Sequence, residues 1–498
     1  MIKVLSNEEM RSFDEYTVKN GASERQLIAN AARKLFESAE YTSPVCIVCG
    51  CGNNGADGLA LAPILKRSGK QVQVYLLTEK ASKEGAFYLE ECKKAGISVE
   101  FFVKGTSFSG YNTVVDCIFG TGFHSKADGI YADAIRAVNE SGAYVISADI
   151  NSGLNGNSGM SGIYVISDLT VALGEYKYGH FLGSAKDAMK NKMRCDVGIK
   201  TDGNCAFLLE RADVKQFFSK RKSNCHKGNF GYVTIIGGSL AYSGAPKLSN
   251  IALCALRSGC GVCRLALPDC IAQYALPYIL ESTLYPLRSE NGHIAFDTES
   301  INGATAGCKC VCIGMGMGVG EAQENIVKHL LLSYKETLII DADGLNCLSR
   351  IDSGILKSTS ANVILTPHIK EFSRLCGKSC EEILSSPVSI AESYAAENGV
   401  TLLLKGACTI VTNGSETYLS DTGCSGMATA GSGDVLSGII TGIMGYADKE
   451  KTALATAAGA YINGISGQIA QNEYTEISML SSDTAKCIPQ AIKYVSEE

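Results

Sequence analysis

Short runs of purely apolar residues recur along this chain at intervals long enough to hold a helix. Strands that are apolar throughout are buried on both faces of a sheet, and helix-length connections between them imply parallel pairing. In the first part of the 498-residue chain, such runs occupy residues 45–49, 72–77, 114–118, 144–148 and 169–173. The pattern predicts an α/β fold with a Rossmann-like, doubly wound sheet.

A charged stretch without strand periodicity, residues 210–225, interrupts this rhythm. The apolar runs then resume at residues 232–236, 262–266, 311–313, 338–340, 363–365 and 401–404. We therefore expect two α/β domains, residues 1–212 and 213–498, and because the halves lack self-similarity we interpret them as a fusion of two units. Capping boxes that begin at Ser6 and Ser23 predict two helices before the first strand of the doubly wound sheet.

The composition narrows the choice of partners. A net charge of −6 argues against nucleic acid or an anionic membrane as the main partner. No segment has the unbroken apolar length of a membrane-spanning helix, and the first residues lack a signal-peptide core, so we expect a cytoplasmic protein. The sequence leaves the oligomeric state open, a homo-oligomer included.

Cysteine is abundant, at 21 residues. Two Cys-x-x-Cys pairs, Cys46/Cys49 and Cys260/Cys263, each offer half a metal site, but no second pair or histidine lies at ligand spacing. Because free cysteine is among the most buried residue types, we expect these side chains to fill the core in a reducing compartment.

Residues 427–434, Met-Ala-Thr-Ala-Gly-Ser-Gly-Asp, directly precede an apolar run that predicts a helix. The unpaired N–H groups at a helix N-terminus carry partial positive charge and bind phosphoryl groups. Asp434 is then suited to take a proton from a hydroxyl that meets the phosphate there. The alternative is an ordinary N-cap by Ser432 or Asp434.

A second glycine-rich segment, residues 49–58, follows the first apolar strand of the doubly wound sheet. Its glycines satisfy G-x-G-x-x-G, the dinucleotide motif, but an aspartate within the segment would repel a pyrophosphate. Further polar residues follow other strands and can meet at the same sheet edge, namely Asp116, Asp149, Ser152 and Lys177. Asn54, Asp116 and Ser152 offer only oxygen, which suits a hard alkali cation better than zinc.

Residues 53–58 (Asn-Asn-Gly-Ala-Asp-Gly), 119–122 (Phe-Gly-Thr-Gly) and the pattern Asp149-x-x-Ser-Gly153 resemble the YjeF N-terminal family, the NAD(P)H-hydrate epimerases. The resemblance implies potassium held by Asn54, Asp116 and Ser152, and proton chemistry by Asp149 and Lys177. It also implies substrate contacts by Asn53, Asn54, Gly55, Ala56, Asp57, Gly120, Thr121, Gly122, Phe123 and Asp149. Ala56 stands where the family has a glycine, which requires a loop dihedral that a Cβ tolerates.

In the second half, glycines follow several strands, and no P-loop motif occurs. The segments 237–245, 314–318, 366–368, 404–409 and 431–434 resemble the YjeF C-terminal family of the ribokinase-like superfamily, the ADP-dependent NAD(P)H-hydrate dehydratases. The resemblance implies that Asp434 is the catalytic base and contacts the substrate together with Ala245, Gly318 and His368. It implies nucleotide contacts by Lys405, Gly406, Ala407, Cys408, Thr409 and Gly433. Asp341 and Asp343 share one side of an extended strand and could approach a metal-bound phosphate. A helix N-cap by Asp343 is an equal alternative, so we assign the two residues no role.

The two resemblances imply one repair activity. Hydrated NADH or NADPH would be epimerised by the first domain and dehydrated by the second, with ADP as co-substrate, K⁺ in the first site and Mg²⁺ in the second. A ribokinase-like kinase that leaves a stable phosphorylated product is the alternative for the second domain. For the first domain, the alternative is a binding module without turnover.

Overall fold

The computed structural model describes residues 1–498 except residues 125, 202, 204, 243 and 498, and for residues 242, 244–249 and 353 it describes the backbone alone. The chain forms two compact units, an N-terminal unit of Lys3–Cys205 and a C-terminal unit of Met1–Ile2 with Ala206–Glu498. The boundary between the units thus lies between Cys205 and Ala206, whereas the predicted boundary was between residues 212 and 213. The reason is β10 (Ala206–Leu208), which pairs with β21 (Thr417–Ser420) of the C-terminal unit.

The N-terminal unit contains a parallel sheet with the strand order β4-β3-β2-β5-β6-β7-β9. The chain runs outward from β2 to one edge and then from β5 to the other, so the prediction of a doubly wound sheet is confirmed. Its strands are β2 (Val45–Cys49), β3 (Val72–Leu76), β4 (Ser98–Phe101), β5 (Thr113–Cys117), β6 (Tyr144–Ala148), β7 (Leu169–Leu173) and β9 (Lys192–Cys195). Two short strands pair with each other in parallel, β1 (Ile2–Leu5) and β8 (Tyr176–Lys177).

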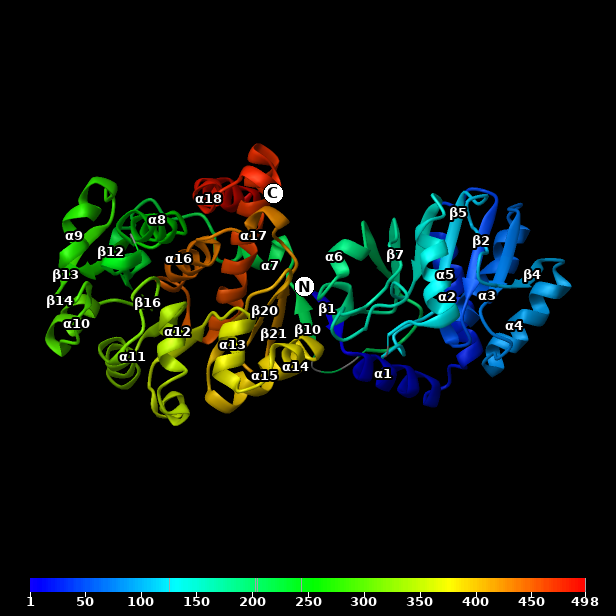
Figure 1. The fold of residues 1–498 in the computed structure, drawn as a ribbon, viewed down its shortest axis with the longest axis horizontal. Coiled ribbons are helices and arrows are strands. Elements are labelled where there is room, and N and C mark those ends of the chain that lie inside the picture. The colour runs from blue at the N-terminus through cyan, green and yellow to red at the C-terminus, as the bar shows by residue number, and fades with distance from the viewer. Residues whose placement is uncertain (125, 202, 204, 243, 498) are drawn as a thin grey trace. The chain divides into compact units, whose positions relative to one another are not determined.

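Helices bury both faces of this sheet, as the apolar strands require (Figure 1). Ile47 and Cys49 of β2 pack in one apolar cluster with α2 and α3, whereas Cys46 and Val48 point to the opposite cluster, which includes α5. The helices are α1 (Asn7–Lys19), α2 (Glu24–Ser38), α3 (Asn53–Arg67), α4 (Lys83–Lys94), α5 (Gly129–Asn139) and α6 (Ala185–Ala188). The two helices predicted before β2 are α1 and α2, and Ser6 forms its capping box with Glu9.

The C-terminal unit has the strand order β13-β12-β11-β16-β17-β18-β19-β20-β21-β10. These strands pair in parallel except at β19-β20 and β20-β21, which are antiparallel. Their bounds are β11 (Tyr232–Ile236), β12 (Val262–Pro268), β13 (Thr283–Leu287), β16 (Cys310–Ile313), β17 (Thr337–Ile340), β18 (Asn362–Leu365), β19 (Thr401–Leu404) and β20 (Thr409–Thr412), and β14 (Ser289–Glu290) and β15 (His293–Ile294) form a hairpin.

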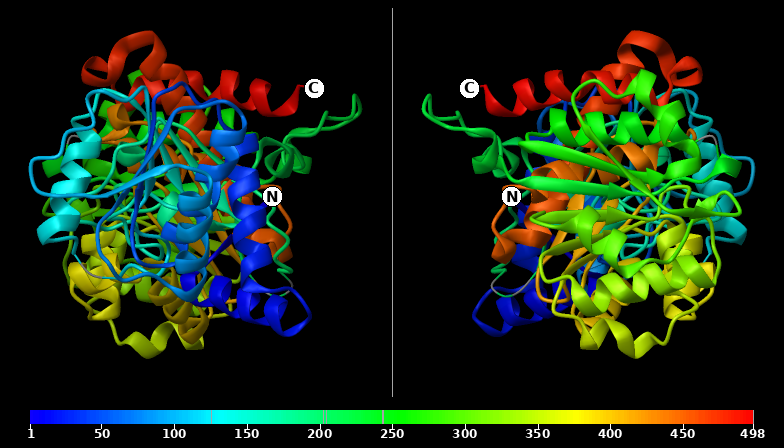
Figure 2. Two further views of the ribbon diagram at one scale, coloured as in Figure 1. Left: turned by 90° about the vertical axis from the view of Figure 1, so that its right-hand side faces the viewer. Right: turned by 90° about the vertical axis from the view of Figure 1, so that its left-hand side faces the viewer.

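Helices α8, α16, α17 and α18 enclose the apolar core on one side of this sheet, and α10 to α15 lie on the other (Figure 1). Figure 2 shows in its right-hand view that helices flank β11, β12 and β13 on both sides. The bounds are α7 (Arg211–Lys215), α8 (Gly244–Arg257), α9 (Asp269–Ala275), α10 (Thr298–Thr305), α11 (Glu321–Ser333), α12 (Asp343–Leu348), α13 (Ile369–Cys376), α14 (Cys380–Ser385), α15 (Pro387–Asn398), α16 (Ser432–Met444), α17 (Thr452–Ser478) and α18 (Ser481–Ser496).

Most of the cysteines lie in the core as expected, but Cys51 and Cys225 are exposed. All 21 are free, and both members of each Cys-x-x-Cys pair are buried. Across the described residues, no three His, Cys, Asp or Glu side chains gather as a metal site. Likewise, no helix in the described part of the chain is both long and apolar enough to cross a bilayer.

Candidate functional site

Asp149 and Lys177 form a buried ion pair at the carboxyl ends of the strands in the N-terminal unit. The Lys177 side chain is 1% exposed, and its Nζ donates to Asp149 Oδ1 at 2.6 Å and to the Leu173 carbonyl at 2.9 Å. Burial favours the neutral acid, but the Lys177 charge outweighs it and lowers the pKa of Asp149. Asp149 has φ of +64°, a strained conformation that re-aims the chain after β6.

His180 forms hydrogen bonds with the backbones of both residues of this pair. The Lys177 backbone N–H donates to His180 Nδ1 at 3.0 Å, so His180 Nε2 carries the proton and donates to the Asp149 carbonyl at 2.7 Å. Burial and the Lys177 charge lower the pKa of His180 to about 4. The imidazole is therefore neutral at pH 7, and it ties the backbones of both ion-pair residues together. No motif in the sequence marks His180.

The predicted cation ligands lie beside the pair. Asp116 is fully buried at the end of β5 and accepts from the Ser152 hydroxyl at 2.5 Å and the Ser152 N–H at 2.9 Å. Asn54 donates through Nδ2 to the Phe119 carbonyl at 2.8 Å, while its buried Oδ1 has no hydrogen-bond partner among the described residues. A Cβ at Gly120 would lie 3.2 Å from Asn54 Cβ and 3.3 Å from Asp149 Oδ2, so Gly120 sits between the ligand group and the ion pair.

Residues 53–57 form the first turn of α3 rather than a loop. Ala56 therefore needs no special dihedral, and its Cβ is buried on the helix. Asp57 is 7% exposed on the same turn, and burial with the nearby Asp149 charge raises its pKa well above the usual range. The side chain of Asn151 donates to the carbonyls of Val165 and Ala188.

The glycine-rich turn in the C-terminal unit leads directly into α16. Gly431 has φ of +93° and ends the turn, and Asp434 lies buried in the first turn of the helix. A Cβ at Gly438 would lie 2.7 Å from the Ile251 carbonyl, which shows how closely α16 packs on α8. Close packing on α8 thus fixes the start of α16, where Gly433 leaves the backbone uncovered on the side of Lys405, while the Ser432 N–H donates to the Thr429 carbonyl at 3.4 Å.

Lys405 lies over this turn. Its Nζ is 2.9 Å from Asp341 Oδ1 and 3.9 Å from Glu371, and a Cβ at Gly433 would lie 3.4 Å from Nζ. Burial disfavours the ammonium, but the charges of Asp341 and Glu371 outweigh it and raise the pKa of Lys405. Asp341 Oδ2 also accepts from the Ser437 hydroxyl at 2.6 Å, so one buried carboxylate links Lys405 to α16.

The prediction that Asp341 and Asp343 share one side of a strand is wrong. Strand β17 ends at Ile340, and Ala342 has φ of +49°, which turns the chain between the two carboxylates. Asp341 then meets Lys405, whereas Asp343 begins α12 and accepts from the Gly318 N–H at 2.9 Å. Asp343 therefore holds the loop of Gly318, a predicted substrate contact.

The remaining predicted residues follow the same sheet edge. His368 is the N-cap of α13, where its Nδ1 accepts from the N–H groups of Lys370 and Glu371, and its ring is half-exposed. A bridge pairs residue 368 with Lys405, so the two predicted contact segments lie side by side. Past Lys405, the chain exposes Gly406 and Ala407 and buries Cys408 before β20 begins at Thr409. Ala245 opens α8, but its side chain lies outside the described part of the structure.

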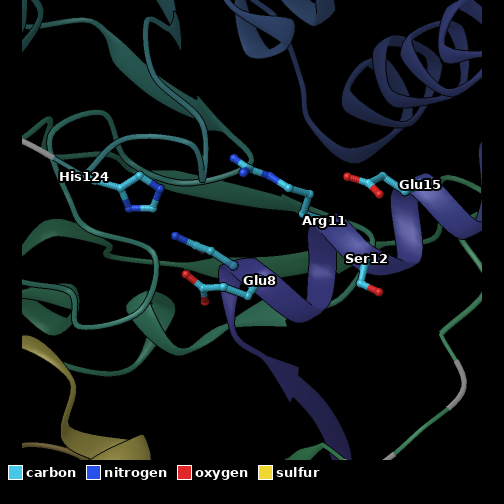
Figure 3. Close-up of a pocket in the computed structure, with 6 residues that line it drawn as sticks. Glu8, Arg11, Ser12, Glu15 and His124 are labelled. Atoms are coloured by element: carbon cyan, nitrogen blue, oxygen red, sulfur yellow. The ribbon is translucent and has the colours of Figure 1, made fainter.

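A shallow hollow of about 210 Å³ lies on the N-terminal unit, between α1 and the segment of His124 (Figure 3). Acidic and basic side chains both line this hollow. The lining residues are Asn7, Glu8, Arg11, Ser12, Glu15 and His124. This balance offers no net attraction for a phosphate.

Two family models match this chain, one within each unit. The family model described as NAD(P)H-hydrate dehydratase matches residues 233–490, and that of the YjeF-related protein N-terminus matches residues 24–179. The bifunctional NAD(P)H-hydrate repair enzyme of Thermofilum pendens is 32% identical over 100% of this chain and 97% of its own length. The enzyme of that name from Moorella thermoacetica is 31% identical over 95% and 93%. The chain belongs to the bifunctional NAD(P)H-hydrate repair family.

A solved structure of another protein has the same fold as the C-terminal unit of this chain. The ADP/ATP-dependent NAD(P)H-hydrate dehydratase from Bacillus subtilis, co-crystallised with ATP and Mg²⁺, aligns with a TM-score of 0.50 at 24% identity, covering 57% of this chain and 97% of that one. The C-terminal unit therefore has the α/β fold of that structure. The individual roles of the site residues stay predictions.

Proposed function

We propose that this chain repairs hydrated NADH and NADPH, with the N-terminal unit epimerising the substrate and the C-terminal unit dehydrating one epimer at the expense of ADP. The observation that carries this function is the approach of Lys405 Nζ to Gly433 at the N-terminus of α16, next to the buried Asp434. A fixed ammonium and outward N–H groups stabilise a transferring phosphoryl group, and the adjacent carboxylate serves its nucleophile.

In the dehydratase step, the substrate hydroxyl on C6 attacks the β-phosphorus of ADP. Asp434 takes the hydroxyl proton, the bond from phosphorus to the AMP oxygen breaks, and Lys405 with the N–H groups of the turn balances the developing charge. Phosphate is a better leaving group than hydroxide. The lone pair of N1 expels it from C6, a proton leaves C5, and the dihydropyridine is restored with AMP and phosphate as products.

Only one epimer can present its hydroxyl in line with the β-phosphate, so the other must first be inverted at C6. We assign this step to Asp149 and Lys177. The ionised Asp149 accepts a proton from the substrate hydroxyl, and the Lys177 ammonium stabilises the oxygen that loses it. The adjoining residues Asn53, Asp57 and 120–123 would surround the ring.

The residues of the N-terminal unit fit a potassium ion. Asn54 Oδ1, which has no partner among the described residues, and the oxygens of Asp116 and Ser152 make a set of hard ligands beside Gly120. When bound, the cation supplies positive charge that fixes the loops around the substrate. In the C-terminal unit, Asp341 and Asp343 are engaged by Lys405 and Gly318, so we expect Mg²⁺ to enter with the phosphates of the nucleotide.

The buried, free cysteines suit a reducing compartment, and on this basis we place the enzyme in the cytoplasm.

The test is to incubate the purified chain with hydrated NADH and ADP. Return of absorbance at 340 nm with stoichiometric AMP and phosphate supports the repair function. A phosphorylated product that persists would instead identify a kinase of the ribokinase type.

A further inference from the structure

Helix α1 contributes one carboxylate, Asp14, to the side of the helix that faces the protein. Residues 7, 10, 14 and 17 share one face at 100° per residue, and Asn7, Met10 and Thr17 on that face are 8%, 3% and 5% exposed. Asp14 lies between Asn7 and Met10 in this projection. The adjoining face carries Glu8, Arg11, Ser12 and Glu15, which line the shallow hollow together with Asn7 (Figure 3).

Contacts on both sides of Asp14 fix α1 to the loops that hold the ion pair. Asn7 Nδ2 donates to the Thr121 carbonyl at 2.7 Å, and the Thr121 N–H points to Asp149 Oδ2 at 3.4 Å. A Cβ at Gly174 would lie 2.7 Å from the methyl group of Met10, and Gly174 follows Leu173, whose carbonyl accepts from Lys177. Helix α1 thus spans the Asp149–Lys177 pair, with Asp14 between its two attachment points.

The Asp14 carboxyl has no structural partner. Among the described residues it makes no hydrogen bond or ion pair, although it is only partly exposed. The charged groups that face it are Lys177 of β8, Asp149 after β6 and Asp57 of α3, with the neutral His180 behind them. Burial, partly offset by Lys177, raises the pKa of Asp14 to about 6.

We propose that Asp14 is the catalytic acid of the epimerase site and donates a proton to ring nitrogen N1 while Asp149 takes the proton of the C6 hydroxyl. This role rests on the proposed epimerase function. The geometry supplies the two parts that such a step needs, because an ionised carboxylate paired with lysine and an unpaired carboxyl on a covering helix converge on one place.

The step balances without any further reactant. C6 of the hydrated ring carries both the hydroxyl and N1, so it is a hemiaminal carbon. As Asp149 removes the O–H proton, a C=O bond forms and the C6–N1 bond breaks, with its electron pair going to N1, which takes the Asp14 proton. Rotation about C5–C6 turns the other face of the aldehyde to the nitrogen. N1 then adds to C6, returns its proton to Asp14, and the oxygen recovers its proton from Asp149.

The test follows the interconversion of purified epimers of hydrated NADH by the full-length chain without ADP, so that the dehydratase step is silent. The required form has Asp14 protonated and Asp149 ionised, so kcat/KM of the wild type should fall as pH rises above about 6. Asp14→Asn should lower the rate about 10²- to 10⁴-fold and abolish this limb. Asp14→Glu should keep a fall of kcat/KM with rising pH, but at a pH different from that of the wild type.

Glu15→Gln is the matched control, because Glu15 is exposed on the other face of α1, and it should leave rate and pH profile unchanged. If Asp14→Asn keeps both the rate and the falling limb, the assignment is overturned, and Asp57 becomes the acid to examine. Should Asp14→Asn fail to fold, an unshifted limb in Asp14→Glu overturns it instead. Failure of the wild type to interconvert the epimers would refute the epimerase function itself. This outcome differs from failure of the Asp14 assignment, in which the wild type remains active.

Discussion

Lys405 Nζ lies 3.4 Å from the position that a Cβ atom of residue 433 would occupy. The ammonium and the backbone of Gly433 therefore face one small space at the start of α16. We expect the transferred phosphoryl group to occupy it. Gly433→Ala would fill part of this space and should lower dehydratase kcat about 100-fold, comparable to the loss of one oxyanion donor.

The same substitution separates activity from folding. Alanine in a helix is up to about 1 kcal/mol more favourable than glycine, so Gly433→Ala should melt no lower than wild type. Gly431→Ala is the contrasting variant, since residue 431 has φ of +93° and its Cβ would lie 2.5 Å from Ser481 Oγ. It should cost about 1–3 kcal/mol of stability. Full activity of Gly433→Ala would contradict the placement of the phosphoryl group.

Asp341 should act through Lys405. Replacing it by asparagine removes the charge that holds the ammonium over α16, and we expect a loss of dehydratase kcat of about 10²-fold, of the order seen when one electrostatic contact is removed. Because the two residues form one unit, Asp341→Asn combined with Lys405→Ala should lose little more than Lys405→Ala alone. The 340 nm assay measures this cycle, with Glu336→Gln, from a surface ion pair, as the control. Additive losses would show that Asp341 and Lys405 act separately.

Potassium should stabilise the N-terminal unit as well as activate it. In K⁺ buffers the wild type should melt higher than in Li⁺ buffers, since a cation at about 100 times its Kd adds ~2.7 kcal/mol. Asn54→Ala removes one proposed ligand and should erase this difference, together with the K⁺ dependence of epimerisation. An Asn54→Ala variant with an undiminished response to K⁺ would place the cation elsewhere.

The neutral His180 should make stability depend on pH. Its pKa is about 4 in the folded chain, against 6.5 for an unperturbed histidine, so the unfolded chain binds this proton first as pH falls. Stability from this group is complete above pH 6.5 and is lost between 6.5 and 4, by about 3 kcal/mol. Urea denaturation at several pH values measures it. The difference between wild type and His180→Asn should shrink as pH falls, and a constant difference would refute the neutral imidazole.

Much of the fold could be predicted from apolar runs, because a strand buried on both faces has no other composition. Strands β2, β6, β7, β11 and β19 have the predicted bounds. Strand β4, whose residues Ser98–Phe101 are mostly exposed, has no such signal, and neither does the antiparallel turn from β19 to β20. An exposed edge strand such as β4 is defined by its pairing with the neighbouring strand, and its own residues carry no apolar run.

The site shows the same limit. The positions of Asp149 and Lys177 after their strands predict that both lie at one sheet edge. They do not predict the ion pair between the two residues, or that His180 holds their backbones together. The positive φ of Ala342, which turns Asp341 and Asp343 apart, cannot be predicted from an alanine. Asp14 has no motif, and its place depends on how α1 packs across two distant loops.

The most direct measurement gives the full-length chain the purified epimer that the dehydratase cannot use, with ADP and Mg²⁺, and follows absorbance at 340 nm. The account predicts complete recovery of NADH by the wild type, none by Asp434→Asn, and loss of nearly all recovery in Asp149→Ala, which should still process the other epimer. Full recovery by Asp149→Ala, or any recovery by Asp434→Asn at the wild-type rate, would contradict it.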